Sequence, residues 1–344
     1  RRTTWIILTR LMMPSARVAA AADTEIVDRA RELRLAGRYS DALVTIGRAK
    51  DPADPEVAAE HAEILLETGK YAALDRVCAS AGNDVRCRTL RAEGLRLRGK
   101  AAEATRMVEE VLADEPDFER ARYLAATLLR DAGKREAAAE AFAWFFDHHA
   151  MNDLEDPEAL TFVALASLRL AELMPDVEME FRPAMKILDT VTGVKGRRGI
   201  DEDYLPAYAA KAEIYLAVYQ DKSAKKEIKR GLARNPRHPM TLYLSALQKD
   251  FEWDTAGAIA RCEEALSVNP AFAEPREFIA TERIADRNFR EAKELLDAVL
   301  VIDPSRRPAR GLLGVIDFLN GDRKAFEARA KELLAENPKF GRVY

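Results

Sequence analysis

Four stretches in the C-terminal part of the chain repeat one pattern: Leu232-Ala233-Arg234-Asn235-Pro236, Leu266-Ser267-Val268-Asn269-Pro270, Leu300-Val301-Ile302-Asp303-Pro304 and Leu334-Ala335-Glu336-Asn337-Pro338. Each proline lies 34 residues after the one before it and follows an Asn or Asp. A constant spacing of this length is typical of proteins built from stacked repeats. Because proline lacks a backbone donor and disfavours helical geometry in the preceding residue, each Asx-Pro pair predicts the end of a helix.

Two further columns keep the same period. The residue twenty-four positions before each proline is always small: Ala212, Ala246, Ala280 and Gly314. The residue twelve positions before is alanine in three copies and phenylalanine in the last: Ala224, Ala258, Ala292 and Phe326. Small residues let two amphipathic helices approach closely, and the leucine before each Asx-Pro closes their shared core. The pattern therefore predicts two antiparallel helices in each unit.

The N-terminal half keeps this pattern with looser spacing. Its inter-helix turns are marked by glycines spaced 32, 30 and 34 residues apart: Gly37, Gly69, Gly99 and Gly133. An alanine stands seven residues before each glycine: Ala30, Ala62, Ala92 and Ala126. The residue five positions after each glycine is Ala42, Leu74, Ala104 or Ala138.

At these positions the chain resembles the tetratricopeptide repeat family over residues 24–338. The resemblance implies an all-α, right-handed superhelical solenoid of antiparallel helix-turn-helix repeats. Nine units are expected, at 24–52, 54–82, 84–117, 118–151, 157–191, 203–236, 237–270, 271–304 and 305–338. The sequence departs from the family pattern where Arg88 and Arg276 replace the bulky aromatic residue that is common early in the first helix.

The units predict five segments along the chain. Residues 1–23 form an N-terminal segment that is expected to be either a signal-peptide remnant or disordered. Residues 24–191 form an array of five units with an irregular fifth, 192–202 a Gly/Arg-rich linker, and 203–338 an array of four regular units. Residues 339–344 would begin a truncated next helix, so the chain is expected to be the N-terminal part of a longer protein. The linker is expected to be a flexible connection, with an anion-binding or partner-docking loop as the alternative. The first helix of the fifth unit, within 156–173, is apolar on nearly all sides and should be unusually buried.

Composition excludes several classes of protein. Hydrophobic residues make up 48% of the chain but aromatic residues only 7%, which favours helices over an all-β fold. With 33% charged residues and no long apolar run, no membrane span is expected. The net charge of −4 gives no global basic field, so no nucleic-acid partner is predicted, and any such binding would have to be local.

The N-terminus leaves the location open. The opening from Arg1 to Met13 has a basic start and an apolar run, which is similar to a signal-peptide remnant, but Arg10 interrupts it. The balance favours a cytoplasmic location, with export to the periplasm as the alternative. Cys78 and Cys87 could form a disulfide or remain buried thiols, and His148 with His149 could approach a metal or lie at a solvated helix end.

The expected binding surface is the inner face of the solenoid. If the family's phase holds, the inward side chains stand at positions two, five, nine and twelve or thirteen of each unit. In the third and fourth units these positions predict a basic groove made by Arg86, Arg96, Arg120 and Arg130, with Tyr123 among them and Glu93 opposing. In the seventh unit they predict an apolar stretch made by Met240, Tyr243, Leu247 and Phe251, and in the ninth by Val315, Phe318 and Leu319.

These patterns predict a binding protein. The arginines would suit an acidic or C-terminal carboxylate peptide, and the apolar stretch a helix or hydrophobic segment. Hydrolase and zinc-peptidase motifs are missing, so no catalytic residue, metal site or cofactor is expected. The chain is therefore predicted to be a non-catalytic scaffold for a protein or peptide. The alternatives are an N-terminal arm of a longer enzyme, such as a hydrolase or peptidase, whose catalytic domain follows Tyr344, and a homo-oligomer formed through the C-terminal units.

Overall fold

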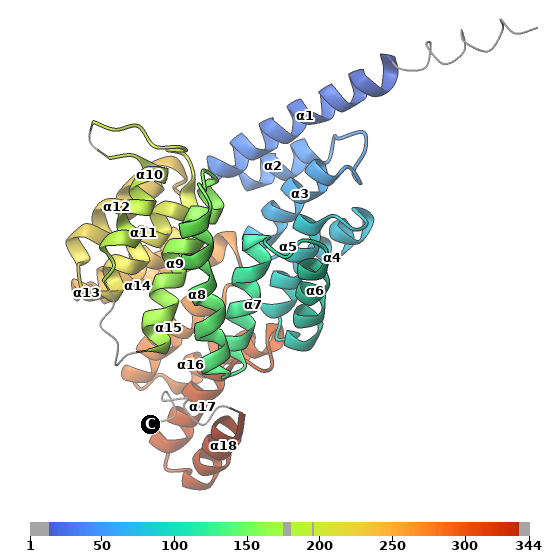
Figure 1. Ribbon diagram of the computed structural model, residues 1–344. Helices are drawn as coiled ribbons and strands as arrows, with labels where there is room; N and C mark the ends of the chain where they lie inside the picture. The colour runs from blue at the N-terminus through green and yellow to red at the C-terminus, as the bar shows by residue number, and fades with distance from the viewer. Residues whose placement is uncertain (1–13, 175–179, 195, 337–344) are drawn as a thin grey trace, which may run out of the picture. The chain divides into compact units, whose positions relative to one another are not determined.

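The computed structural model describes residues 14–174, 180–194 and 196–336 (Figure 1). Within these residues there are eighteen α-helices, and no β-structure beyond an isolated bridge between Val194 and Arg197. The first helices of the pairs are α1 (Pro14–Leu35), α3 (Pro55–Glu67), α5 (Val85–Arg96), α7 (Glu119–Asp131), α9 (Pro157–Leu173), α11 (Leu205–Ala217), α13 (Pro239–Phe251), α15 (Ala273–Ala285) and α17 (Arg307–Leu319). The second helices are α2 (Tyr39–Ile46), α4 (Tyr71–Ser80), α6 (Ala101–Asp114), α8 (Arg135–Met151), α10 (Arg182–Thr192), α12 (Asp221–Arg234), α14 (Thr255–Val268), α16 (Phe289–Ile302) and α18 (Arg323–Glu336). The all-α helix-turn-helix solenoid is thus confirmed.

The expectations for the two ends of the chain fall partly outside the described residues. Helix α1 begins at Pro14, ahead of the first expected unit, and residues 1–13 of the suspected signal-peptide remnant are not among those described. The expected truncated helix at 339–344 lies outside them as well. None of the described helices is long and apolar enough to cross a lipid bilayer.

The small residues of the repeat lie where the paired helices touch. Ala212, Ala246 and Ala280 are fully buried, and so are Ala224, Ala258 and Ala292 in the second helices. In the last pair a Cβ placed on Gly314 would lie 3.6 Å from the ring of Phe326, the residue that breaks the alanine column. A small side chain on one helix thus faces either a small or a large one on its partner, which sets the distance between the helices.

The Asx-Pro motif ends the second helix in two ways. The proline stops helical pairing, and the Asx side chain then accepts a hydrogen bond from the backbone N–H two residues later. Three copies share this bond at 2.9 Å: Arg237 N to Asn235 Oδ1, Ala271 N to Asn269 Oδ1 and Ser305 N to Asp303 Oδ1. The motif therefore fixes the direction in which the chain enters the next pair.

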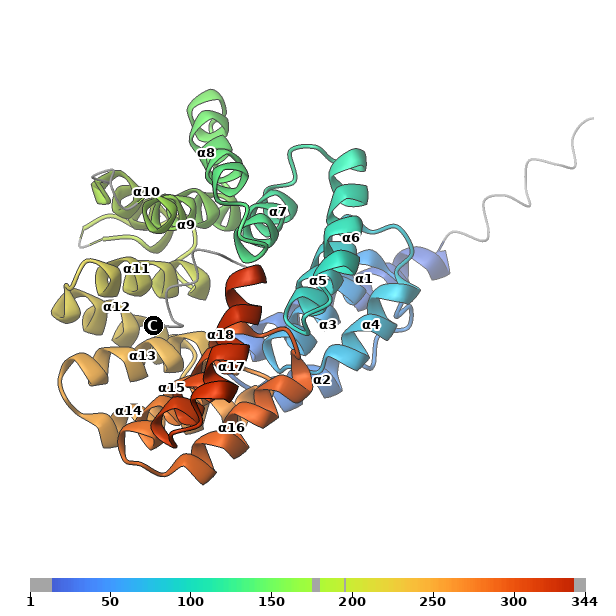
Figure 2. The ribbon, with the colours of Figure 1, turned by 90° about the horizontal axis from the view of Figure 1, so that it is seen from below.

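Several first helices pack directly on one another. Contacts join α7 to α9, α9 to α11, α11 to α13 and α15 to α17. In the view of Figure 2, α9, α11 and α13 lie on the inner side of the arc and α10, α12 and α14 on the outer side. As expected, α9 is deeply embedded, because it packs against α7, α8, α10 and α11 and buries Leu160, Val163 and Leu168.

The chain divides into two compact units, Arg1–Arg91 and Ala92–Tyr344. The boundary falls within α5, and the linker at 192–202 lies inside the second unit.

The two ends of the linker contact the next helix pair, and its expected flexibility stays a prediction. The Tyr208 hydroxyl donates to the Glu202 carbonyl at 2.8 Å, and Arg230 donates to the Thr192 carbonyl at 3.0 Å. Lys211, whose side chain is 2% exposed, binds the Asp189 carboxylate at 2.5 Å and the Thr192 hydroxyl at 3.1 Å. A buried ammonium with these partners fixes the end of α10 against α11.

The turns between paired helices place one residue in the left-handed region. Glycine fills this place in the first four pairs and in the last, where Gly321 has φ 82°. Tyr219, Trp253 and Arg287 fill it in the sixth, seventh and eighth pairs, with φ of 58°, 61° and 60°. These residues keep the 34-residue period. The left-handed conformation costs a residue with a Cβ about 1–2 kcal/mol.

Glycine at position 253 should therefore stabilise the protein relative to valine. The Trp253 side chain is 92% exposed, so either change removes little packing. We expect Trp253→Gly to exceed Trp253→Val by about 1–2 kcal/mol in the free energy of unfolding, measured by thermal and urea unfolding. The control is Lys293→Gly at an exposed position within α16, which should be destabilising by about 1 kcal/mol. Equal stability of the two position-253 variants would contradict the strain.

Candidate binding surface

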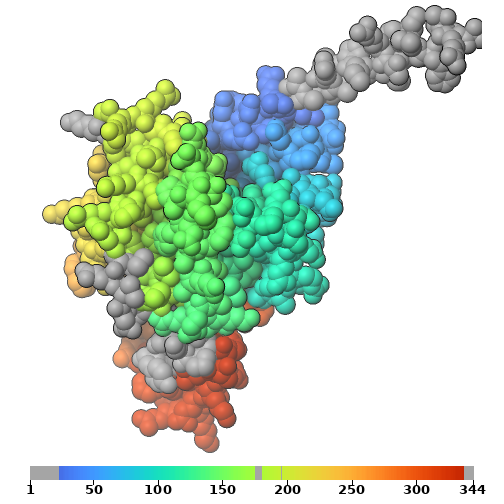
Figure 3. All heavy atoms as spheres, in the orientation of Figure 1, coloured from blue at the N-terminus to red at the C-terminus, as the bar shows by residue number. Residues whose placement is uncertain are grey.

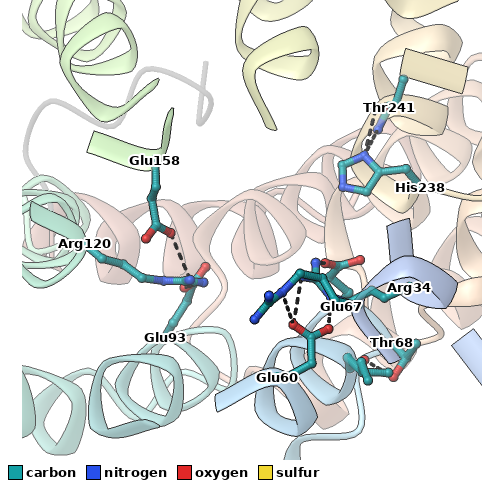
Figure 4. A network of polar contacts seen from close by, with 11 residues as sticks. Arg34, Glu60, Glu67, Thr68, Glu93, Arg120, Glu158, His238 and Thr241 are labelled. Carbon is teal, nitrogen blue, oxygen red and sulfur yellow. Dashed lines mark hydrogen bonds and ion pairs between the residues drawn. The ribbon is translucent and has the colours of Figure 1, made fainter. Parts of the chain in front are cut away.

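The inner-layer arginines of the second unit are joined to carboxylates of neighbouring first helices. We call Arg96, Arg120, Arg130 and Arg169 with their acidic partners the arginine ladder. Its contacts are Arg96–Asp131 at 2.9 Å, Arg120–Glu93 at 3.3 Å, Arg120–Glu158 at 3.0 Å, Arg130–Glu172 at 3.8 Å and Arg169–Glu213 at 2.5 Å. Figure 4 shows Arg120 reaching between Glu93 and Glu158. The ladder therefore connects α5 to α7, α7 to α9 and α9 to α11.

The ladder leaves no basic groove. Its four arginines face five carboxylates, and the side chains of Arg96, Arg120 and Arg130 are only 22%, 15% and 29% exposed. Glu93, predicted to oppose the arginines, is itself bound to Arg120. An acidic peptide would have to displace carboxylates already in place, so the predicted basic groove is corrected to a charge-balanced surface. Arg86 is exposed on the part of α5 that belongs to the first unit.

Tyr123 is a packing residue of this region. Its ring stacks on Phe162 with centroids 4.8 Å apart and meets Phe142 edge-on at 5.5 Å. Its hydroxyl accepts a hydrogen bond from Arg169 Nε at 3.2 Å. Burial raises the pKa of Tyr123 above its ordinary value, so the phenol stays neutral while its hydroxyl accepts the hydrogen bond from Arg169 of the ladder.

The first unit contains a similar junction between α1 and α3. Arg34 binds Glu60 at 2.7 Å and Glu67 at 2.6 Å (Figure 4). Burial opposes the charge on Arg34, but Glu67 and Glu60 outweigh it and raise the pKa of the guanidinium well above its usual value. Arg34 is thus a fixed charge that ties two first helices together.

The predicted apolar residues do share one face of α13. Met240 and Phe251 are 41% and 43% exposed, and Tyr243 and Leu247 are half-buried between them. We call these four side chains the apolar stripe. Their spacing of three to four residues places them in one row along the helix. The ring of Phe272 packs edge-on against the ring of Tyr243, with centroids 5.6 Å apart.

Of the first helices that follow α13, α15 exposes small side chains and α17 exposes a large one. On α15 the exposed positions are Thr281 and Ala285, whereas Phe318 on α17 is 50% exposed. Carboxylates lie nearby: burial raises the pKa of Glu282, and the charges of Asp250 and Asp286 raise it further. This surface is therefore apolar with an acidic border.

A cavity of about 800 Å³ opens between α10 and α11. Its lining includes Phe181, Met185, Tyr215 and Val218 beside Lys186. No sequence pattern pointed to this cavity.

The cysteines and histidines bring no cluster of metal ligands together. Among the residues that the structure describes, no three His, Cys, Asp or Glu side chains gather in a way that could hold a metal ion. His148 stacks on Trp144 and contacts Glu119 at 3.3 Å. The three cysteines are free thiols, and hydrogen bonding to Cys78 together with burial raises the pKa of Cys87.

Comparison with known proteins supports the fold alone. No family model and no curated protein matches the chain. Among solved structures, human IFIT1 with m7Gppp-AAAA aligns over 89% of this chain and 75% of its own, with a TM-score of 0.53 and 12% identity. Human IFIT1 with PPP-AAAA gives a TM-score of 0.44 over 86% and 68% of the chains at 15% identity, and the Cut9–Hcn1 complex of the APC/C gives 0.39 over 95% and 81% at 13% identity. The chain is thus similar in fold to helical repeat proteins.

The ladder should contribute to stability. We expect Arg120→Met to lower the free energy of unfolding by about 1–2 kcal/mol, because Glu93 and Glu158 lose a shared, part-buried cation. Adding Glu93→Gln and Glu158→Gln should recover much of this loss. The control is Arg29→Met, which removes an exposed ion pair with Glu32 and should cost no more than about 0.5 kcal/mol. Urea unfolding followed by circular dichroism measures all four proteins, and an Arg120 variant no less stable than the control would contradict the role.

Proposed function

We propose that the chain is a non-catalytic, tetratricopeptide-like scaffold that binds a protein segment on the apolar stripe of α13. The observation behind this proposal is the row of Met240, Tyr243, Leu247 and Phe251 on an inner-layer helix, with its two end residues more than two-fifths exposed. Large apolar side chains gathered on one surface gain free energy when a partner covers them.

The shape and charge of this surface indicate the partner's chemistry. A row of side chains along one helix suits an amphipathic helix whose own apolar residues recur every three to four positions. Asp250 and Glu282 at the border favour a partner with Lys or Arg beside its apolar residues. The arginine ladder does not take part, because its charges are already paired.

The fold comparison is compatible with a binding role and selects no ligand. The IFIT1 structure with a TM-score of 0.53 contains m7Gppp-AAAA, so the same architecture can bind an RNA fragment. The test must therefore separate a peptide ligand from other ligands.

Selection from a displayed library of 16-residue peptides tests the proposal. We expect enriched peptides to combine apolar residues at helical spacing with Lys or Arg. Fluorescence anisotropy of a selected peptide should show at least a tenfold loss of affinity, or about 1.4 kcal/mol, for Met240→Glu and Phe251→Glu. The reason is that each change places a carboxylate where an apolar contact would form.

Two controls make the result specific. Val301→Glu changes an apolar residue that is 83% exposed on α16, and it should leave peptide affinity unchanged. Light scattering of the unliganded protein over a range of concentrations tests whether a second copy covers the stripe. Equal losses of peptide affinity for Val301→Glu and Phe251→Glu would count against a peptide partner. So would a molecular mass of the unliganded protein that rises with concentration and that Phe251→Glu lowers.

A further inference from the structure

The outer layer of the second unit carries a concentrated positive charge that takes no part in the proposed peptide site. Residues 222–237 contain seven Lys or Arg and a single acid, Glu227, in a chain whose net charge is −4. Glu227 is buried and faces Lys211 and Arg230, so it neutralises nothing at the surface. Helix α12 lies at the left edge of the views in Figures 1 and 3, on the outer side of the pair that it forms with α11.

The basic residues of α12 divide between two faces. Arg230 and Arg234 turn toward the body of the protein, where both lie over the ring of Tyr208. Lys222, Lys225, Lys226 and Lys229 are exposed. Their spacing of three, four and seven residues places them on one side of the helix. We call these four lysines the basic face of α12.

Two aromatic side chains stand at the N-terminal end of the basic face. Tyr219, three residues before Lys222, is 81% exposed, and Trp253 is 92% exposed. The 2.7 Å contact between Lys225 and Glu252 brings the Trp253 turn beside the first turn of α12, and the Tyr219 and Phe251 rings lie 6.0 Å apart. Of the nearby acids, Glu252 binds Lys225 and Asp254 binds Lys249, whereas Asp221 stands in the first turn of α12.

These aromatic residues are held out in solvent at an energetic cost. Both occupy the left-handed turn position where five other pairs of the described chain have glycine. Neither ring is buried, so core packing does not account for their presence. Strained positions with exposed side chains often mark a binding site.

The chemistry of this surface suits a phosphate backbone better than a protein partner. The centres of protein interfaces are depleted of lysine and enriched in apolar side chains, whereas the basic face consists of lysines alone. A line of ammonium groups beside flat, exposed aromatic rings matches the requirements of single-stranded nucleic acid, in which phosphates alternate with stackable bases. We propose that the basic face of α12, with Tyr219 and Trp253, binds single-stranded nucleic acid. The expectation of no nucleic-acid partner rested on the global charge and did not weigh this local surface.

Salt-dependent binding of a fluorescein-labelled 20-nucleotide oligouridine to the full chain tests the proposal. The three lysines of the basic face that bind no carboxylate, Lys222, Lys226 and Lys229, predict a slope of about −2 in a plot of log affinity against log salt concentration. Lys226→Glu with Lys229→Glu removes two of these three contacts, so it should weaken binding at least tenfold and reduce the slope to about a third. The matched control, Lys324→Glu with Lys331→Glu on the exposed side of α18, makes the same change in net charge and should retain the wild-type slope.

The role of the two aromatic residues can be tested with a variant that is not expected to unfold. Tyr219→Gly with Trp253→Gly removes both rings while placing glycine where φ is positive, so the fold should hold or gain stability. We expect at least a fivefold loss of oligouridine affinity from lost stacking. Absence of oligouridine binding at low salt, or equal affinities of the α12 and α18 double variants, would overturn the proposal. Equal displacement by polyglutamate of the same charge, or binding to phosphatidylserine vesicles in place of the oligonucleotide, would also overturn it.

Discussion

The close approach of the two helices in each pair depends on small side chains at their contact. Ala212, Ala246 and Ala280 are fully buried, and their partners Ala224, Ala258 and Ala292 are buried as well. A pair built this way has too little apolar surface to be stable alone, so it must stack on its neighbours. The low aromatic content of the chain is a consequence, because alanine and leucine contacts between near helices replace a central core of large rings.

Polar contacts then set how successive pairs follow one another. The Asn or Asp before Pro236, Pro270 and Pro304 turns the chain toward the next first helix, and the arginine ladder ties neighbouring first helices together. The irregular fifth unit keeps this continuity through Lys211, which joins the end of α10 to α11. The apolar stripe on α13 and the basic face of α12 are the two surfaces that we propose for partners.

The fold could be predicted from the sequence because a repeated proline and a repeated alanine each have one structural consequence. The binding surface could be predicted only in part. The exposed row from Met240 to Phe251 follows from helical periodicity, but the pairing of Arg120 with Glu158 joins residues 38 positions apart on different helices. Sequence spacing gives no signal for such a pair. Trp253 could have been placed at its turn by counting back from Gly321 in two steps of 34 residues. Its positive φ could not, because tryptophan does not favour the left-handed region.

Hydrogen exchange of Ala246→Leu tests most directly whether small-residue contacts hold the solenoid together. A larger side chain at this fully buried position should force α13 from α14 and cost about 1–3 kcal/mol. Mass spectrometry should show amide protection falling in α13 and α14 and, through the stacked contacts, in α12 and α15. Helices α1 to α4 of the first unit should keep their protection. Unchanged protection in α13 and α14, or an equal loss along the whole chain, would contradict the account.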